Sequence, residues 1–337
     1  MRSNSPRHVF LGGLAVAALA LTGCASTPAA DDASGTLSIV ASTNVYGSIA
    51  EAVGGDLVTV TSIITSAAQD PHSFEASAQD QLALSKADLV IENGGGYDPF
   101  IDTLLSAGSN DAPVVNASEA SGLLDGDEHT HDDEATDDAS TDAATDDAST
   151  EEEHSDDDGH DHIEGFNEHV WYSFHGVEHV AEEIAHQLSE IDADNAATYE
   201  ANYEAFAAQI EELEASAEAL HPITEGLGVA ITEPVPLYLL EAAGFTNQTP
   251  AEFSEAIEEG TDVAPSVLQE TLALFSAKSV ALLAYNSQTA SSETEQVRAA
   301  AEDNDVAVVK FTETMPDGAD YVSWMTDNLS AISAAVK

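Results

Sequence analysis

Four side chains that carry metal-binding atoms stand where the chain is expected to turn. His72 lies in the loop after the second predicted strand, Glu233 and Asn286 each directly follow a later strand, and His169 begins a predicted helix. In open α/β sheets, ligands bind beyond the carboxyl ends of the strands. Imidazole nitrogens together with carboxylate and amide oxygens suit a divalent transition metal. Each residue alone also fits an ordinary loop, cap or turn, so the set is informative only jointly.

An acidic, histidine-rich tract precedes His169. Between Asp125 and Glu164 the chain has 19 Asp or Glu residues, no Lys or Arg, and no aromatic residue. Such a segment cannot bury enough apolar surface to offset its ordering entropy, so we expect residues 125–165 to form a disordered loop. The imidazoles in it predict an auxiliary role in collecting divalent metal, through His129, His131, His154, His160 and His162.

The first residues predict export from the cytoplasm. Arg2 and Arg7 precede an apolar run from Val9 to Leu21, which is shorter than the roughly 20 residues that cross a bilayer. The sequence Leu-Thr-Gly-Cys that ends at Cys24 resembles a bacterial lipobox, although an ordinary signal peptide with a nearby cysteine has the same start. We therefore expect a lipoprotein signal peptide over residues 1–23, lipidation of Cys24, and a flexible tether over residues 24–35.

The charge and length of the chain limit its partners and its organisation. The 337 residues include 63 Asp or Glu but only 7 Lys or Arg, which gives a net charge of −56. Such a surface repels nucleic acid and attracts cations, although acidity also serves solubility or a salty habitat. Cys24 is the single cysteine, so no disulfide forms within one chain. The length suits two lobes better than a single core.

Short apolar runs alternate with helical patterns in both halves, which predicts an α/β fold with parallel sheets. The elements expected in the first half are strand Thr36–Ser42, helix Asn44–Val53, strand Leu57–Ile64, helix Ala78–Lys86, strand Asp88–Glu92, helix Asp98–Ala107, strand Pro113–Asn116 and helix His169–Ile191. Those expected in the second half are strand Gly228–Thr232, helix Pro236–Ala243, helix Pro265–Ala277, strand Ser279–Tyr285, helix Glu293–Asp303, strand Val306–Phe311 and helix Tyr321–Val336.

A long helix is expected to join the two lobes. Asp194–Leu220 contains no Gly or Pro, and its larger apolar residues recur at intervals of four and three, which marks one apolar stripe. The predicted organisation is an N-terminal α/β lobe over 36–192, a rigid linking helix over 193–221, and a C-terminal α/β lobe over 222–337.

Four motifs resemble those of the ZnuA-like (cluster A-I) substrate-binding lipoproteins of zinc and manganese ABC importers. Asp70–Glu75 is similar to the family's D-P-H-x-aromatic-E motif, and Asn167–Trp171 is similar to N-P-H-x-W, with Glu168 in place of Pro. The resemblance implies that His72 and His169 are the first two metal ligands. It further implies that Glu233, within Thr232–Pro234, is the third ligand and that Asn286, within Tyr285–Gln288, stands at the fourth position, which is often Asp in the family. Either the Asn286 amide oxygen is then a weak ligand, or water or another carboxylate completes the coordination. The metal would lie in a cleft between the lobes.

The resemblance also implies a function. A monomeric, extracytoplasmic protein, lipid-anchored to the outer face of the cell membrane through Cys24, would capture zinc and deliver it to an ABC permease. Zinc is favoured over manganese by the Irving–Williams order at a mixed nitrogen and oxygen site and by the histidine-rich loop. A manganese-specific protein of the same family, and a surface adhesin or metal buffer without a transporter, are the alternatives.

Catalysis is not expected. The chain has no His-Glu-x-x-His helix and no Gly-x-Ser-x-Gly elbow, so neither zinc-dependent hydrolysis nor a serine nucleophile has a motif. His175, His179 and His186 recur at helical spacing on one face of a predicted helix. An exposed polar face explains them better than a supplementary metal pair.

Overall fold

The computed structural model describes residues 36–124, 163 and 165–337. Thr36–Lys337 forms one compact unit. The predicted signal peptide, Cys24, the tether and the five histidines of the acidic tract lie outside the described residues, so their assignments stay predictions. No helix among the described residues combines the length and the apolar character that a membrane span requires.

The first half contains a parallel sheet of four strands in the order β2-β1-β3-β4. Its elements are β1 (Leu37–Thr43), α1 (Asn44–Gly54), β2 (Val58–Ile64), α2 (Ala78–Leu84), β3 (Leu89–Glu92), α3 (Phe100–Ala107), β4 (Val114–Asn116) and α4 (Ala117–Ala120), with a 3-10 turn at Gly55–Leu57. All seven elements expected here between residues 36 and 116 are present, with ends that shift by one or two residues.

The second half contains another parallel sheet, with the equivalent order β6-β5-β7-β8. Its elements are α7 (His221–Thr224), β5 (Gly228–Ile231), α8 (Leu237–Ala242), β6 (Thr246–Asn247), α9 (Ala251–Glu258), α10 (Pro265–Ser276), β7 (Leu282–Asn286), α11 (Ser292–Asp303), β8 (Ala307–Phe311) and α12 (Tyr321–Ala335). The short elements α7, β6 and α9 were not predicted. The predicted α/β class with two parallel sheets is confirmed.

Each sheet is packed on both of its faces, because successive side chains of a strand point to opposite faces and an apolar cluster lies on each one. In the first sheet, Ile39 and Ile91 face the apolar cluster that also contains side chains of α1 and α5, whereas Val40 and Val90 face the cluster with side chains of α3. The second sheet shows the same alternation between two clusters. This packing explains why the strands appear in the sequence as nearly continuous apolar runs.

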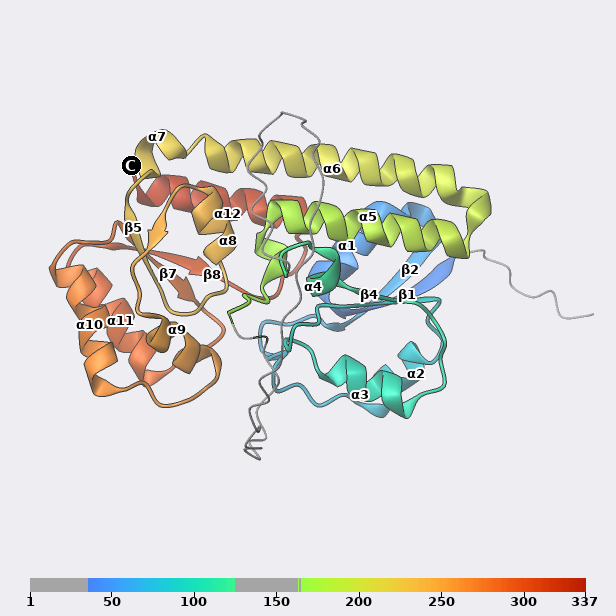
Figure 1. The fold of residues 1–337 in the computed structure, drawn as a ribbon, viewed down its shortest axis with the longest axis horizontal. Helices are drawn as coiled ribbons and strands as arrows, with labels where there is room; N and C mark the ends of the chain where they lie inside the picture. The colour runs from blue at the N-terminus through green and yellow to red at the C-terminus, as the bar shows by residue number, and fades with distance from the viewer. Residues whose placement is uncertain (1–35, 125–162, 164) are drawn as a thin grey trace, which may run out of the picture. The chain divides into compact units, whose positions relative to one another are not determined.

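Two long helices run alongside each other across the molecule (Figure 1). α5 spans Phe174–Ile191, and after a 3-10 turn at Ala193–Asn195 the 23-residue α6 spans Ala196–Glu218. α6 contacts α1 and α5 of the first half as well as α8 and α12 of the second. The predicted long helix is therefore confirmed, and it packs on helices from both halves.

The helix predicted from His169 begins later, at Phe174. Val170–Tyr172 instead forms a 3-10 turn, and the Ser173 hydroxyl accepts a hydrogen bond from the Gly176 amide as the N-cap of α5. The cap ends the non-helical segment, so His169 lies at the start of the 3-10 turn and outside α5.

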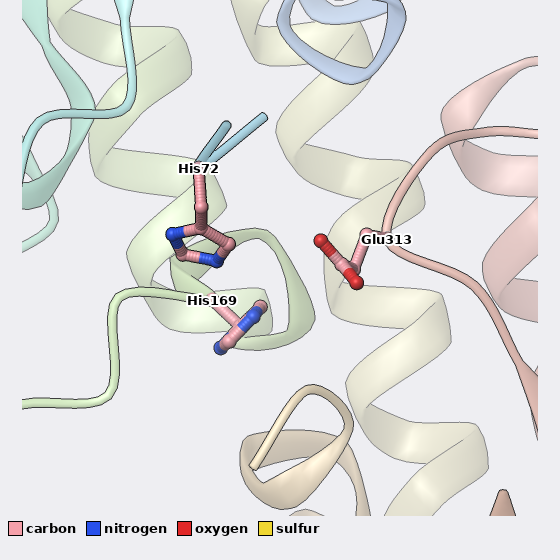
Figure 2. A group of neighbouring side chains, drawn as sticks. All are labelled: His72, His169 and Glu313. Atoms are coloured by element: carbon pink, nitrogen blue, oxygen red, sulfur yellow. The ribbon is translucent and has the colours of Figure 1, made fainter. Parts of the chain in front are cut away.

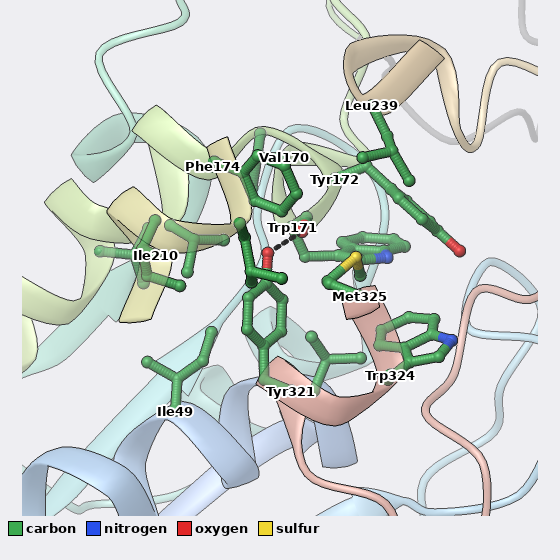
Figure 3. Close-up of a cluster of buried hydrophobic side chains, with 14 of the residues drawn as sticks. Ile49, Val170, Trp171, Tyr172, Phe174, Ile210, Leu239, Tyr321, Trp324 and Met325 are labelled. Carbon is green, nitrogen blue, oxygen red and sulfur yellow. Dashed lines mark hydrogen bonds between the residues drawn. The ribbon is translucent and has the colours of Figure 1, made fainter. Parts of the chain in front are cut away.

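An aromatic cluster joins this turn to α12 (Figure 3). Trp171, Tyr172 and Tyr321 are almost completely buried, and Trp324 packs against Tyr172 with ring centroids 5.5 Å apart. The Tyr321 hydroxyl donates a 2.6 Å hydrogen bond to the Trp171 carbonyl oxygen. α12 thus fixes the turn that carries His169.

The Tyr321 hydroxyl should contribute measurably to stability. We expect Tyr321→Phe to lower the free energy of unfolding by about 1–2 kcal/mol, because the buried Trp171 carbonyl loses its donor. Urea unfolding of the metal-free protein measures this change. Ser330→Ala, on the exposed side of the same helix, is the control and should change the free energy by less than about 0.5 kcal/mol. A loss no larger than that of the control would contradict the assigned role.

Candidate metal site

Three polar side chains lie at the carboxyl ends of adjacent strands in the second sheet. Glu233 follows β5, Asn286 ends β7, and Glu313 follows β8. β7 pairs with both β5 and β8, so Asn286 lies between the two carboxylates. Parallel pairing brings these strand ends to one edge of the sheet, where α/β proteins bind ligands.

The Asn286 amide links the two carboxylates. Its Nδ2 donates hydrogen bonds to Glu233 Oε2 and, at 2.8 Å, to Glu313 Oε1. Its Oδ1 accepts a 3.0 Å hydrogen bond from the Gln288 amide, which fixes the orientation of the side chain. The nitrogen of Asn286 therefore faces the acidic groups, and its oxygen faces the backbone.

His72 is positioned by a turn within Asp70-Pro71-His72-Ser73. Asp70 Oδ1 accepts a 3.0 Å hydrogen bond from the His72 amide, and Asp70 Oδ2 accepts a 2.7 Å hydrogen bond from the Ser73 hydroxyl. This Asx turn sets the direction in which the His72 side chain leaves the backbone. The imidazole packs edge-on against the buried Tyr97 ring, with centroids 4.9 Å apart.

Asn167 fixes the proton position of the His169 imidazole. Asn167 Oδ1 accepts a hydrogen bond from the His169 amide and lies 2.8 Å from His169 Nδ1, while Asn167 Nδ2 donates to the Pro234 carbonyl oxygen at 3.2 Å. Because the atom facing Nδ1 is an acceptor, neutral His169 carries its hydrogen on Nδ1. Its Nε2 then keeps the lone pair that a metal needs, as in metal-binding histidines whose second nitrogen is hydrogen-bonded.

His72, His169 and Glu313 converge on one point (Figure 2). One nitrogen from each imidazole and one oxygen from Glu313 all lie within 4.8 Å of one another. Ligand atoms around a tetrahedral zinc ion are about 3.4 Å apart, so side-chain shifts of an ångström or so would complete the coordination. The Tyr97 hydroxyl donates a 3.3 Å hydrogen bond to Glu313 Oε2, which orients this carboxylate.

Buried carboxylates surround the two imidazoles. Burial, and then the charge of the neighbouring Glu233, raise the pKa of Glu313 to about 8, although the Asn286 hydrogen bond acts in the opposite direction. Burial also raises the pKa of Glu233. Burial and then the charge of Glu168 raise the pKa of Glu258 well above its ordinary range. Such groups are stabilised in their charged form by a bound cation.

The four residues predicted as ligands all lie in this region, where His72 and His169 form one pair and Glu233 and Asn286 form another. His72 and His169 come together with their ring centroids 6.5 Å apart. Asn286 donates hydrogen bonds to both Glu233 and Glu313. Glu313 itself was not predicted as a ligand. It follows a predicted strand as Glu233 does, so the strand-end rule would have found it. Glu258 could not be found in this way, because it ends α9.

The other histidines of α5 lie apart from this group. The His175 and His179 rings are 4.4 Å apart, and among the described residues neither belongs to a convergent group of three or more metal-binding side chains. His186 Nε2 lies 3.7 Å from Glu190 Oε1 on the exposed surface. This arrangement fits the exposed polar face expected from the sequence.

Known proteins resemble this chain over most of its length. The sequence model of a family described as zinc-uptake complex component A, periplasmic, matches residues 39–335. The manganese-binding lipoprotein MntA of Halalkalibacterium halodurans is 29% identical over 253 residues, 73% of this chain and 71% of that protein. The manganese ABC transporter substrate-binding lipoprotein ScaA of Streptococcus gordonii is 26% identical over 345 residues, 96% of this chain and 97% of that protein.

The fold is also shared with a solved structure. The SBP FpvC from Pseudomonas aeruginosa in complex with Mn2+ superimposes with a TM-score of 0.67 at 21% identity, covering 89% of this chain and 98% of that one. At this level of identity, the likeness establishes the common fold alone.

The raised pKa of Glu313 makes stability depend on pH. Between the ordinary value of 4.5 and about 8, the folded protein holds a proton on Glu313 that the unfolded chain has lost. The free energy of unfolding of the metal-free protein should therefore fall as pH rises through this window. Urea unfolding at pH 5.5 and pH 8, with chelator present, measures the fall. Glu313→Gln should reduce it, and an unchanged pH dependence would contradict the assignment.

Proposed function

Because the chain belongs to the zinc-uptake complex component A family of metal ABC transporter substrate-binding proteins, we propose that it captures zinc for import. The prediction that it is not an enzyme is confirmed by this membership. The observation that carries the proposal is the convergence of His72, His169 and Glu313 among buried carboxylates. Substrate binding by ion coordination explains both the ligand geometry and the excess negative charge.

The proposed ligands are His72, His169, Glu233 and Glu313. Glu313 replaces Asn286 in the set that the sequence resemblance implied, because the Asn286 amide nitrogen is directed at the carboxylates and its oxygen accepts from Gln288. Asn286 then acts as a positioning residue that holds the two carboxylates at a fixed separation. Two neutral imidazoles and two ionised carboxylates would together balance the charge of a bound divalent ion.

Zinc is the proposed substrate, with manganese as the second candidate. A site of two nitrogens and two oxygens binds zinc more tightly than manganese by the Irving–Williams order. Manganese is favoured instead by the names of the relatives MntA and ScaA. Competition between the two ions for the same purified protein separates these assignments.

The proposed setting is the outer face of the cell membrane. MntA and ScaA are lipoproteins, and the predicted lipobox at Cys24 would supply the same type of anchor here. A monomer held by this lipid would present its metal to an ABC permease in the same membrane. The acidic tract would raise the local zinc concentration through many weak sites beside one strong site.

Substitutions at the site should separate ligands from positioning residues. We expect His72→Ala and Glu313→Ala each to weaken zinc binding by more than about 100-fold, because each removes a ligand, and Asn286→Ala to weaken it by roughly 10–100-fold. Competition with a chromophoric chelator, with elemental analysis of the bound ion, measures these changes. His186→Ala, on an exposed part of α5, is the matched control and should bind as wild type does.

The proposed ligand set would be contradicted if Asn286→Ala weakened zinc binding more than Glu313→Ala did, since the Asn286 amide oxygen would then be the ligand. Tighter binding of manganese than of zinc would overturn the choice of metal and leave metal capture intact. Wild-type protein that bound neither ion tightly would overturn the proposed function.

Removal of the acidic tract should leave the tight site in place. A chain without residues 125–162 should still bind one zinc ion with wild-type affinity, because the proposed ligands all lie outside the tract. The weaker additional sites should disappear, which isothermal titration calorimetry of both proteins would detect. Loss of the tight site on deletion would place at least one ligand within the tract.

A further inference from the structure

A second convergent group adjoins the proposed site. One ligand atom each from His72, Glu168 and Glu258 lie within 4.8 Å of one another, and His72 is common to this group and to the one with Glu313. Glu168 is 3% exposed, and the Glu258 side chain is 13% exposed. Glu258 Oε1 also lies 3.6 Å from His169 Nδ1, the ring nitrogen that faces Asn167 Oδ1.

Glu168 and Glu258 lie in surroundings that disfavour their negative charges. They are buried side by side, and Glu258 ends α9, where the helix dipole disfavours a negative charge. The chain has no Lys or Arg between Lys86 and Lys278 to compensate them. A pair of buried carboxylates in such surroundings requires a proton or a cation, and the nearby imidazole supplies the third ligand that a cation would use.

This group lies where solvent reaches the interior. A surface hollow of about 650 Å³ is lined by both Glu168 and Glu258, together with Asn167, Phe166 and the exposed acidic residues Glu255 and Glu259. His169 and Glu313 do not line this hollow. The carboxylate pair therefore stands between the solvent in the hollow and these two proposed ligands.

We propose that His72, Glu168 and Glu258 form an outer, transient position through which a divalent cation passes to and from the inner ligands. This inference rests on the proposed function. A neutral imidazole offers one lone pair, so His72 binds one ion at a time and the two positions are alternatives. The ion would exchange Glu168 and Glu258 for His169 and Glu313 without returning to bulk water.

A second hollow borders His72 and provides the rival route. It has a volume of about 790 Å³ and is lined largely by apolar side chains such as Phe74 and Phe100, with Glu75 as its single acidic residue. A hydrated divalent cation is drawn to the acidic hollow rather than to this one, because negative potential raises the local concentration of cations. The two routes predict different effects of neutralising Glu168 and Glu258.

Rapid mixing of the full-length chain with Zn²⁺ tests the proposal. In Glu168→Gln/Glu258→Gln, the association and dissociation rate constants should both fall by about tenfold, because the ion loses a position of intermediate energy on its way in and out. The dissociation constant should change by less than about threefold, since the inner ligands remain. Removing two like buried charges should leave the protein folded, which urea unfolding would verify.

Glu255→Gln/Glu259→Gln is the matched control, because it removes the same charge from the rim of the same hollow. If Glu168→Gln/Glu258→Gln had the same rate constants as this control, the proposal would be overturned and the apolar route favoured. A weaker dissociation constant with an unchanged association rate would also overturn it, since the carboxylates would then be ligands of the held ion. Wild-type protein without tight zinc binding would instead refute the proposed function itself.

Discussion

Four carboxylates, those of Glu168, Glu233, Glu258 and Glu313, are buried around two imidazoles in a chain that is nearly free of cationic side chains there. Burial is the main cause that raises the pKa values of Glu233, Glu258 and Glu313, and like charges held in a dry environment also repel one another. The Asn286 amide and the Thr289 and Tyr97 hydroxyls offset part of this repulsion. A bound divalent cation would offset most of the remaining repulsion between the carboxylates, so the arrangement favours the binding of such an ion.

The repeated topology explains how such a site can exist. Each half has a parallel sheet with an equivalent strand order, and the ligands leave the carboxyl ends or the loops beyond them. Hydrogen bonds join the halves around the ion position, from Tyr97 to Glu313 and from Asn167 to the Pro234 carbonyl oxygen. Residues from both halves would therefore determine the geometry of a bound ion, and neither half carries all of the proposed ligands.

The shared core limits how an ion can be exchanged. One apolar cluster contains residues of both sheets, of α5, α6 and α12, so separating the halves widely would expose a large apolar surface to water. Movement of loops and side chains at the edge of the site costs far less, because it leaves that cluster intact. A stepwise path along neighbouring ligands, with His72 held in place by its turn, suits a protein of this construction.

The sequence by itself determined the class of fold, because strand periodicity and helical stripes are local patterns that packing on two faces enforces. The sequence also predicted His72 and His169 as metal-binding residues. Nearby residues of the same segments position them, through hydrogen bonds with Asp70 and Asn167. Only the tertiary structure decided which carboxylates meet them. Glu313 joins the site because β8 pairs with β7, and Glu258 joins it because the short helix α9, which was not predicted from the sequence, packs beside Glu168. The β7–β8 pairing and the packing of α9 beside Glu168 are contacts between segments that are distant in the sequence, so a local sequence pattern does not predict them.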